Sequence, residues 1–358
     1  MNVAFVIPSM LRGGAERAIS ILCNEFINGG HNVTLILTEK TERVCYPLNP
    51  DVNVVNISLE KGPFILRFLR QSQLFSRLLK EREIEIVISF ITRTNLLSII
   101  TCKIAGVPII ISERNNPYIV PSSSIFRKVR DFFYRFADGV VFQTKYAKEY
   151  YCKSIQNKST IIMNPISDIT SYRVPFNSKI NRIVTTCRLD PQKNVKMLIE
   201  AFSKIENRIP SFKLVIYGDG EQMDDLRNIV LNHGLDSRIV FMGQVSNALE
   251  EVSRSKIFVL SSNFEGLSNS VIEALCLGTA CVVTDSPTYG NRDLINPGQN
   301  GYLTKVGDAD DMAEKLLQIV ENEDLCKQFS CEAQKLYNKV NSKMIYNSWL
   351  LFVNKVLS

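Results

Sequence analysis

The stretch FEGLSNSVIEALCLG, residues 264–278, places Glu265 and Glu273 on either side of glycine and small polar residues. Its second half has the apolar spacing of a short helix, and Gly278 stands where helices commonly end. Ser270 and Glu273 have the spacing of a capping box, in which both side chains satisfy free backbone N–H groups. Capping would account for Glu273 but leaves Glu265 unexplained, so the pattern is either a helix start or a ligand site.

The rest of the chain alternates short β-branched runs with helical patterns. In the first half the predicted strands are 2–7, 32–37, 53–57, 84–89, 107–112, 139–142 and 160–163. The predicted helices between them are 15–28, 64–82, 94–105, 123–136 and 144–154. The same alternation restarts at residue 181 and continues to the C-terminus. This pattern predicts parallel sheets that are covered on both faces by helices.

The chain length and one polar segment predict two doubly wound α/β domains. Residues 166–180 are polar and contain Pro175, which is typical of a linker between domains 1–165 and 181–340. Ligands of such sheets bind beyond the carboxyl ends of the strands. Two domains that face each other therefore predict a site in the cleft between them.

Composition narrows the class of protein. Hydrophobic residues make up 45% and charged residues 22%, and no apolar run reaches the roughly 20 residues that span a bilayer. The N-terminus, MNVAFVIPSM, lacks the features of a signal peptide, so we expect a cytoplasmic protein. The nine cysteines are scattered and the two histidines, His31 and His233, lie far apart in the sequence, so we expect no structural metal.

The net charge of +6 is uneven: residues 1–165 carry +8 and residues 166–358 carry −2. This asymmetry indicates an anionic partner for the first half, which is a phosphate-bearing substrate, a membrane surface or nucleic acid. Two helices, 64–82 and 125–136, concentrate the positive charge: Arg67, Arg70, Arg77 and Lys80 share one broad face of the first, and the second carries Arg127, Lys128, Arg130 and Arg135. Basic amphipathic helices suit an anionic membrane surface, and the alternative is an ordinary solvated face.

Three loops that follow strands are candidate phosphate sites. The first is Arg12-Gly13-Gly14-Ala15-Glu16, whose glycines would let backbone N–H groups approach an anion, although a Gly-Gly pair also makes a simple tight turn. The second, residues 187–194, carries Arg188 and Lys193, which either bind a diphosphate or are solvated. The third is the helix start in 264–278, where free N–H groups and the helix dipole attract an anion.

The combination of these motifs resembles a known family. FEGLSNSVIEALCLG is similar to the E-x7-E motif of retaining glycosyltransferases of family 4, which have the GT-B fold. The order of the other motifs agrees over nearly the whole chain: GGAER at 13–17, Arg188-x4-Lys193, YGDG at 217–220 and NGYL at 300–303. The resemblance implies two Rossmann-like domains that face each other across a cleft, with part of 341–358 packing back on the first.

The resemblance also implies what each residue binds. The second domain would bind a nucleotide-sugar, most simply a UDP-sugar, with Glu273 on the ribose hydroxyls and Glu265 on the transferred sugar. The catalytic residues would be Glu265, Arg188 and Lys193. The other donor-binding residues would be Gly13, Gly14, Gly218, Asp219, Gly220, Val245, Gly266, Leu267, Ser268, Asn269 and Ser270.

The implied reaction transfers a hexose or N-acetylhexosamine, with retention, to a hydroxyl of a polyprenyl-diphosphate-linked glycan in surface polysaccharide biosynthesis. Negative charge grows on the leaving diphosphate, and Arg188 and Lys193 would stabilise it in place of a divalent ion. We therefore expect neither metal nor cofactor. The enzyme would be peripheral on the inner face of the cell membrane, attached through the two basic helices.

The acceptor side of the resemblance contains one departure. Related enzymes often have a histidine after the strand that here ends at Ser112-Glu113, and this chain has Arg114. Arg114, Arg67 and Arg70 are the predicted acceptor-binding residues. The alternative for Arg114 is an ion pair with Glu113 or Asp138.

Three other classes of protein stay open at this stage. A nucleotide-sugar epimerase or a phosphorylase would share the fold and would be told apart by its products. A nucleic-acid-binding protein would use the basic first half, although no stacking aromatic array or known nucleic-acid motif supports it. A sugar-binding receptor would need an export signal.

Overall fold

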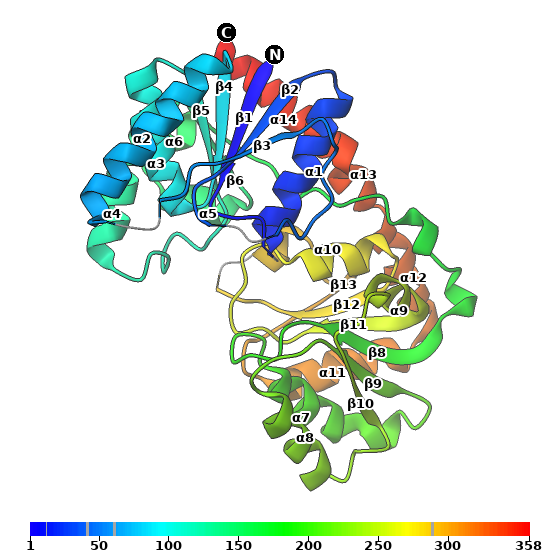
Figure 1. Ribbon diagram of the computed structural model, residues 1–358. Coiled ribbons are helices and arrows are strands. Elements are labelled where there is room, and N and C mark those ends of the chain that lie inside the picture. Colours follow the sequence, from blue (N-terminus) through cyan, green and yellow to red (C-terminus); the bar gives the residue numbers. More distant parts are fainter. Residues whose placement is uncertain (12, 41–42, 60–61, 288–289) are drawn as a thin grey trace. The chain divides into compact units, whose positions relative to one another are not determined.

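The structure is a computed structural model that describes residues 1–11, 13–40, 43–59, 62–287 and 290–358. In it the chain divides into two compact units, Met1–Ser167 with Val340–Ser358 (unit 1) and Asp168–Lys339 (unit 2). Each unit is built on a parallel sheet with helices on its faces (Figure 1). The predicted pair of doubly wound sheets is confirmed, and so is the return of the C-terminal helix to the first of them.

Unit 1 contains a seven-stranded sheet in the order β3-β2-β1-β4-β5-β6-β7. The chain order reverses between β1 and β4, so this is the switch point at which a doubly wound sheet opens a crevice. The strands are β1 Asn2–Ile7, β2 Asn32–Leu37, β3 Asn53–Asn56, β4 Ile86–Phe90, β5 Ile109–Glu113, β6 Gly139–Phe142 and β7 Ser159–Ile161.

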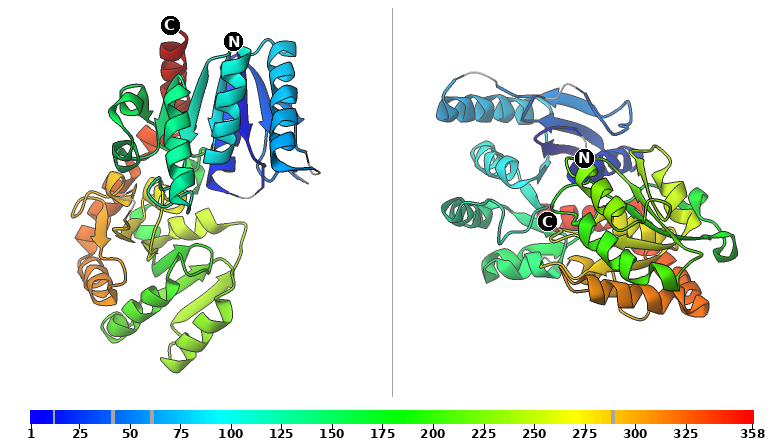
Figure 2. Two further views of the ribbon diagram at one scale, coloured as in Figure 1. Left: turned by 90° about the vertical axis from the view of Figure 1, so that its left-hand side faces the viewer. Right: turned by 90° about the horizontal axis from the view of Figure 1, so that it is seen from below.

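Helices cover both faces of the unit 1 sheet, as Figures 1 and 2 show. Successive residues of β1 point to opposite faces: Val3 and Phe5 join the cluster of α1 (Gly14–Asn28), whereas Ala4 joins the cluster of α2 (Phe64–Glu81) and α3 (Thr92–Ala105). The C-terminal helix α14 (Ser342–Leu357) lies on the α1 face, where Trp349 is fully buried. The β-branched run of β1 is therefore hydrophobic throughout because both faces are covered.

The segment that follows β6 differs from its prediction. A single helix over 144–154 was expected, but the chain forms α5 (Lys145–Tyr150) and α6 (Lys153–Asn157). Tyr151 between them is extended and buried, and its ring stacks on Phe142 with centroids 5.0 Å apart. The core contact of Tyr151 outweighs the local preference for one continuous helix. The helix predicted at 123–136 similarly ends as α4 at Ser124–Phe133, followed by a 3₁₀ turn at Tyr134–Phe136.

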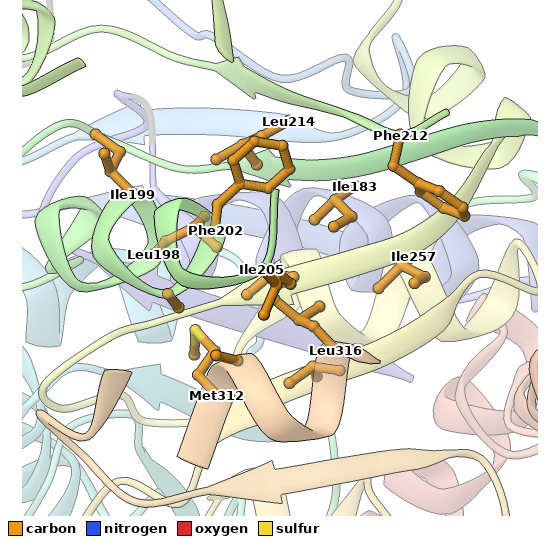
Figure 3. Close-up of a cluster of buried hydrophobic side chains, with 14 of the residues drawn as sticks. Ile183, Leu198, Ile199, Phe202, Ile205, Phe212, Leu214, Ile257, Met312 and Leu316 are labelled. Carbon is orange, nitrogen blue, oxygen red and sulfur yellow. The ribbon is translucent and has the colours of Figure 1, made fainter. Parts of the chain in front are cut away.

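Unit 2 contains a six-stranded sheet in the order β10-β9-β8-β11-β12-β13, with its switch point between β8 and β11. The main core lies between this sheet and helices α7 (Val195–Ile205), α8 (Met223–Asn232) and α11 (Ala309–Val320). Figure 3 shows side chains of this core from α7, α11 and the sheet. The strands are β8 Ile180–Thr186, β9 Lys213–Tyr217, β10 Ile239–Gly243, β11 Ser255–Leu260, β12 Ala280–Thr284 and β13 Gly301–Thr304.

The opposite face of this sheet carries α9 (Ala248–Arg254) and α10 (Asn269–Cys276), and α12 (Glu323–Gln334) packs against α10 and β12 (Figure 1). The short helix α13 (Tyr337–Val340) leads into α14. Within the part of the chain that the structure describes, no helix combines the length and the apolar character needed to cross a membrane.

Candidate active site

The loop after β8 places Lys193 at the switch point of unit 2. Asn194 adopts the left-handed conformation, with φ of 46°, and its side chain accepts a hydrogen bond from the N–H of Met197, which starts α7. The Lys193 N–H donates to the carbonyl of Asp190 at 3.0 Å. This turn and cap end the loop beside β11, because β8 and β11 are adjacent strands.

Lys193 and Glu265 form a buried ion pair across that switch point. The lysine Nζ lies 2.5 Å from Glu265 Oε1, and the same oxygen accepts a hydrogen bond from the Ser262 hydroxyl at 2.7 Å. Glu265 is only 8% exposed. Removing one member of such a pair leaves a buried charge without compensation, which costs more than the pair itself contributes. The sequence predicted both residues for one site, and the structure brings them together.

Hydrogen bonds between two loops hold this pair in place, and the sequence did not predict them. The Asn263 N–H donates to the carbonyl of Gln192 at 2.8 Å, and the Asn263 amide donates to the carbonyl of Pro191 at 2.9 Å. In return, the Gln192 side chain donates to the carbonyl of Phe264 at 2.9 Å. These contacts join residues about seventy positions apart, so no local sequence pattern could have revealed them.

The start of α10 contradicts the capping-box interpretation. The N-cap is Ser268, its side chain makes no capping hydrogen bond, and its hydroxyl instead lies 3.2 Å from that of Ser270. Ser270 is already the second residue of the helix, and Glu273 lies half-buried one turn further on. The Ser268 side chain therefore does not cap the first turn, where the helix dipole favours an anion.

The predicted glycines pack the neighbouring loops against each other. Gly218 has φ of +130°, and a Cβ on it would lie 1.8 Å from the carbonyl oxygen of Cys187. A Cβ on Gly220 would lie 2.4 Å from the carbonyl oxygen of Leu189, whose N–H donates to the Asp219 carbonyl at 2.9 Å. Only glycine allows these backbones to approach so closely.

The loop after β10 and the segment around Gly266 also meet this edge of the sheet. The Gly218 N–H donates to the carbonyl of Gly243 at 2.8 Å, two residues before the half-buried Val245. A Cβ on Gly290 would lie 2.0 Å from the carbonyl oxygen of Gly266. Leu267, which follows Gly266, is buried. The loops after β8, β9, β10 and β11 thus gather at one edge, as the sequence predicted.

Arg188 lies apart from the buried pair. Its side chain is 73% exposed and forms an ion pair with Asp190 at 3.2 Å. An exposed pair of this kind contributes little to stability, so the guanidinium can change partners at low cost. The same loop therefore carries one largely buried cation, Lys193, and one exposed cation, Arg188.

In unit 1 the Glu16 carboxylate lies beside the glycine loop. Arg12 lies outside the described residues. The Gly13 N–H donates to the Tyr46 hydroxyl at 3.2 Å, and the Glu16 carboxylate lies within 2.1 Å of the position that a Cβ on Gly13 would occupy. Burial raises the pKa of Glu16. Gly14 begins α1 and is exposed.

Glu113 is a buried hydrogen-bond centre that the sequence interpretation named only as a partner of Arg114. Its carboxylate accepts from the Tyr134 hydroxyl at 2.8 Å, from the Thr92 hydroxyl at 3.0 Å, and from the backbone N–H groups of Arg114 and Asn115 at 3.0 and 3.1 Å. All of these donors surround one carboxylate that is 1% exposed. Glu113 therefore fixes the turn from which Arg114 extends.

The Arg114 side chain does not form the ion pair that was the alternative for it. Its guanidinium donates to the Asn164 side chain at 2.5 Å and lies 4.4 Å from the centre of the Phe90 ring. Asp138 instead pairs with Lys103 at 2.6 Å. Burial lowers the pKa of Arg114, and its Nε and one terminal nitrogen have no hydrogen-bond partner. Both donors lie in the interior of unit 1.

Helix α4 differs from its predicted basic face, whereas α2 keeps Arg70, Arg77 and Lys80 exposed. In α2, Arg67 is half-buried and Arg70 is exposed. In α4, Arg130 is fully buried and donates to the carbonyls of Val120 and Pro117, and Arg127 donates to the carbonyls of Pro121 and Ser122. Both arginines thus support the preceding loop. The exposed side of α4 is mainly apolar, and its exposed large hydrophobic residues are Ile125, Phe126, Val129 and Phe132.

Metal-binding clusters of three or more His, Cys, Asp or Glu residues are absent from the described ranges. Asp308-Ala309-Asp310 has the spacing of a metal-binding pair, but the structure gives both carboxylates other partners. Asp308 caps α11 by accepting from the N–H of Asp311 at 2.9 Å, and Asp310 pairs with Lys204.

Two family models match the chain, and together they cover most of it. Residues 12–168 match the model described as Glycosyltransferase Family 4. Residues 169–336 match the model described as Glycosyl transferases group 1. The boundary between the matches falls close to the end of the first segment of unit 1.

Two curated relatives from Campylobacter jejuni align over almost their whole lengths. One is a GalNAc-alpha-(1->4)-GalNAc-alpha-(1->3)-diNAcBac-PP-undecaprenol alpha-1,4-N-acetyl-D-galactosaminyltransferase, which is 29% identical over 99% of both chains. The other is an N-acetylgalactosamine-N,N'-diacetylbacillosaminyl-diphospho-undecaprenol 4-alpha-N-acetylgalactosaminyltransferase, which is 25% identical over 95% of this chain and 96% of its own.

Solved structures confirm the GT-B fold. Anabaena Alr3699/HepE in complex with UDP matches with a TM-score of 0.86 at 17% identity, over 99% of this chain and 100% of that one. The lipopolysaccharide outer core galactosyltransferase WaaB in its apo form matches with a TM-score of 0.79 at 20% identity, over 99% of both chains.

Proposed function

Because the chain belongs to the glycosyltransferases of family 4, we propose that it transfers a hexose or N-acetylhexosamine from a UDP-sugar, with retention of configuration. The acceptor is a hydroxyl of a polyprenyl-diphosphate-linked glycan, and the product is an intermediate of surface polysaccharide biosynthesis. The observation that carries the proposal is the buried Lys193–Glu265 pair at the switch point of unit 2. It places a fixed cation and a fixed carboxylate beside a helix start without a capping side chain.

These groups match the charges of a sugar diphosphate. Lys193 and the first-turn N–H groups of α10 offer positive charge to the diphosphate, and Arg188 can add a second cation from the same loop. Glu265 accepts hydrogen bonds from the hydroxyls of the transferred sugar, and Glu273 accepts them from the ribose. When the donor binds, the Lys193 ammonium bridges Glu265 and the diphosphate instead of serving Glu265 alone.

The proposed reaction uses this arrangement. The bond between the anomeric carbon and the diphosphate oxygen breaks, and the acceptor oxygen forms a bond to that carbon on the same face. The acceptor proton moves to the departing diphosphate, so no side-chain nucleophile is needed. Lys193 and Arg188 stabilise the charge that grows on the leaving group, which is the role of a divalent ion elsewhere. We therefore propose that transfer needs no metal.

The relatives support the choice of substrates. The names of both Campylobacter relatives specify undecaprenol-linked diphosphate glycans as their acceptors. The Anabaena structure was solved with UDP, and further structures of that protein contain UDP with glucose and UDP-glucose. A lipid-linked acceptor also accounts for the basic charge of unit 1, and we place the enzyme on the inner face of the membrane.

A ligand screen tests the donor. UDP-, GDP- and dTDP-sugars are added to the full chain and thermal unfolding is followed. A UDP-sugar at about a hundredfold above its Kd should raise the midpoint of unit 2 by about 5–10 °C. The other nucleotide-sugars should have smaller effects. Protection by none of the three classes would contradict the proposal.

A product analysis tests the reaction. With a prenyl-diphosphate-linked acceptor, NMR of the product should show the anomeric configuration of the donor. An inverted product would contradict retention. A sugar epimerised at C2 without transfer would favour the epimerase alternative instead.

A further inference from the structure

Unit 1 contains a cavity of about 800 Å³ that the proposed chemistry does not use. It lies on the face of the sheet that carries α2 and α3, and its floor is formed by residues that follow β2, β4 and β5, such as Thr38, Thr92 and Asn115. Such carboxyl-terminal edges are where doubly wound sheets bind ligands. The volume is within the range of about 300–1,000 Å³ that is typical of small-molecule sites.

The walls of the cavity are mainly apolar. They come from loops and helices that are distant in the sequence, namely Leu59, Phe68, Leu96, Leu97, Val120 and Phe126. A surface of this kind binds hydrocarbon because burying apolar area is favourable, by roughly 25 cal/mol per Å². The donor, a polar nucleotide-sugar, would not be held by such walls.

The same cavity contains cationic side chains. Arg67, Lys40 and Arg93 line it, with Glu39 as the charged residue of opposite sign. Arg93 and Glu39 lie 3.6 Å apart and are both exposed, so their pair is weak. The Nε of Arg67 is buried and has no hydrogen-bond partner. A cavity with apolar walls and a net positive set of cations complements a ligand that joins a hydrocarbon to a phosphate.

Exposed apolar side chains continue from the cavity to the surface. Phe126 lines the cavity and is still 62% exposed, and its neighbour Ile125 is also exposed. On α2, Leu66 and Leu69 flank the lining residues Arg67 and Phe68 and are about half exposed. These side chains add exposed apolar surface on the two helices that contribute to the cavity.

We propose that this cavity binds the phosphate-proximal end of the acceptor's polyprenyl chain, with Arg67 on the diphosphate. The proposal rests on the proposed function, because that function supplies a prenyl diphosphate as the acceptor. Unit 1 then recognises the isoprenoid part of the acceptor as well as its glycan part.

The test uses farnesyl diphosphate as a short, soluble probe. Its binding to the full chain is measured by isothermal titration calorimetry and compared with that of inorganic diphosphate and farnesol. Farnesyl diphosphate should bind at one site and at least about tenfold more tightly than either fragment, because only it uses both the walls and the cations. Equal binding of farnesyl diphosphate and inorganic diphosphate would overturn the proposal.

Three variants locate the site. Arg67→Gln should weaken farnesyl diphosphate about tenfold or more, since it removes a charged hydrogen-bond donor. Phe126→Asn and Leu96→Trp should weaken farnesyl diphosphate, by a polar group in the apolar wall and by filling the cavity, but should leave inorganic diphosphate unchanged. Matched controls are Lys153→Gln, on exposed α6, and Leu351→Asp, on α14 and 73% exposed, which should bind like the wild type.

The outcome separates this proposal from the proposed function. Loss of farnesyl diphosphate binding in the controls but not in the three variants would overturn the cavity assignment. Displacement of the probe by phosphatidylglycerol micelles at equal concentration would also overturn it, in favour of a membrane phospholipid. UDP-sugar protection is measured in parallel: its failure contradicts the glycosyltransferase reaction, whereas its success with no farnesyl diphosphate binding contradicts only the cavity proposal.

Discussion

The two units share one topology at their switch points but fill them with different chemistry. In unit 2, between β8 and β11, the buried Lys193–Glu265 pair is surrounded by loops in backbone contact. In unit 1, between β1 and β4, the glycine loop holds its own carboxylate, Glu16, and an apolar cavity with cations adjoins β4. The fold supplies an edge where loops meet, and the residues of those loops decide whether it suits a polar or an amphiphilic ligand.

The rigidity of the two edges differs as well. In unit 2, Gly218 and Gly220 bring backbone against backbone, so the loops have few alternative positions. In unit 1 the atoms nearest to a Cβ on Gly13 belong to the Glu16 side chain, which can turn away. Charge stabilisation in a transition state requires fixed donors, which is why we assign the chemistry to unit 2.

The largest expected effect comes from breaking the buried pair of unit 2. Lys193→Ala and Glu265→Ala should each lower kcat by about 10²–10³-fold, because one removes the fixed cation and the other the sugar contact. Turnover is measured at saturating UDP-sugar. Lys204→Ala, on α7 and in an exposed pair with Asp310, should keep wild-type turnover. A near wild-type rate in either the Lys193 or the Glu265 variant would contradict the assignment of these residues to catalysis.

The next effect tests the packing of the unit 2 loops. Gly218→Ala should destabilise unit 2 by about 3 kcal/mol, since φ is +130° and the new Cβ would meet the carbonyl of Cys187. Hydrogen exchange should speed up in β8 and β9 while β1 and β4 stay protected. Gly234→Ala, with φ of +65° and no neighbour within 4 Å, should cost only about 1 kcal/mol. Equal costs at the two positions would show that the loops are not tightly packed.

A third effect tests the polar centre of unit 1. Glu113→Gln should lower the stability of unit 1 by about 1–3 kcal/mol, because an amide N–H₂ would replace an oxygen that accepts from N–H and hydroxyl groups. Thermal unfolding with hydrogen exchange in β5 measures it. The exposed Glu149→Gln, which loses a pair with Lys145, should change stability by no more than about 0.5 kcal/mol. If the Glu113 variant is as stable as that control, the hydrogen bonds to Glu113 contribute little to the free energy of unfolding.

Removal of divalent metal ions is expected to have no effect on the transfer rate. Treatment with EDTA should leave the transfer rate unchanged if Lys193 and Arg188 carry the charge that a divalent ion would otherwise balance. Magnesium should likewise fail to restore the Lys193→Ala variant. Loss of activity in EDTA that magnesium reverses would contradict metal-independent transfer.

Local patterns in the sequence were sufficient for some features. The β-branched runs predicted every strand of the unit 1 sheet to within a few residues, because a buried parallel strand is apolar on both faces. The E-x7-E and Arg188-x4-Lys193 spacings selected Glu265 and Lys193, which the structure places 2.5 Å apart. Strand ends are positions in the sequence, so residues that follow neighbouring strands could be assigned to one edge.

Other features depended on contacts between distant segments. The sequence suggested a capping role for Ser270, but packing of the β11–α10 loop starts the helix at Asn269 with Ser268 as the N-cap. It suggested that Arg130 faces a membrane, but the carbonyls of Val120 and Pro117 hold that side chain in the interior. A helical period shows which residues share a face, but not whether that face meets solvent or another loop.

The sequence by itself thus determined that two doubly wound sheets follow each other along the chain, and which charged residues come after their strands. These features depend on hydrophobic periodicity, composition and position in the chain. The tertiary structure alone decided which cation is buried with which carboxylate, why Gly218 must be glycine, and that α2, α3 and α4 enclose a cavity. Those features arise where loops separated by tens of residues come within a few ångströms, and such distances are set by packing, not by any local pattern.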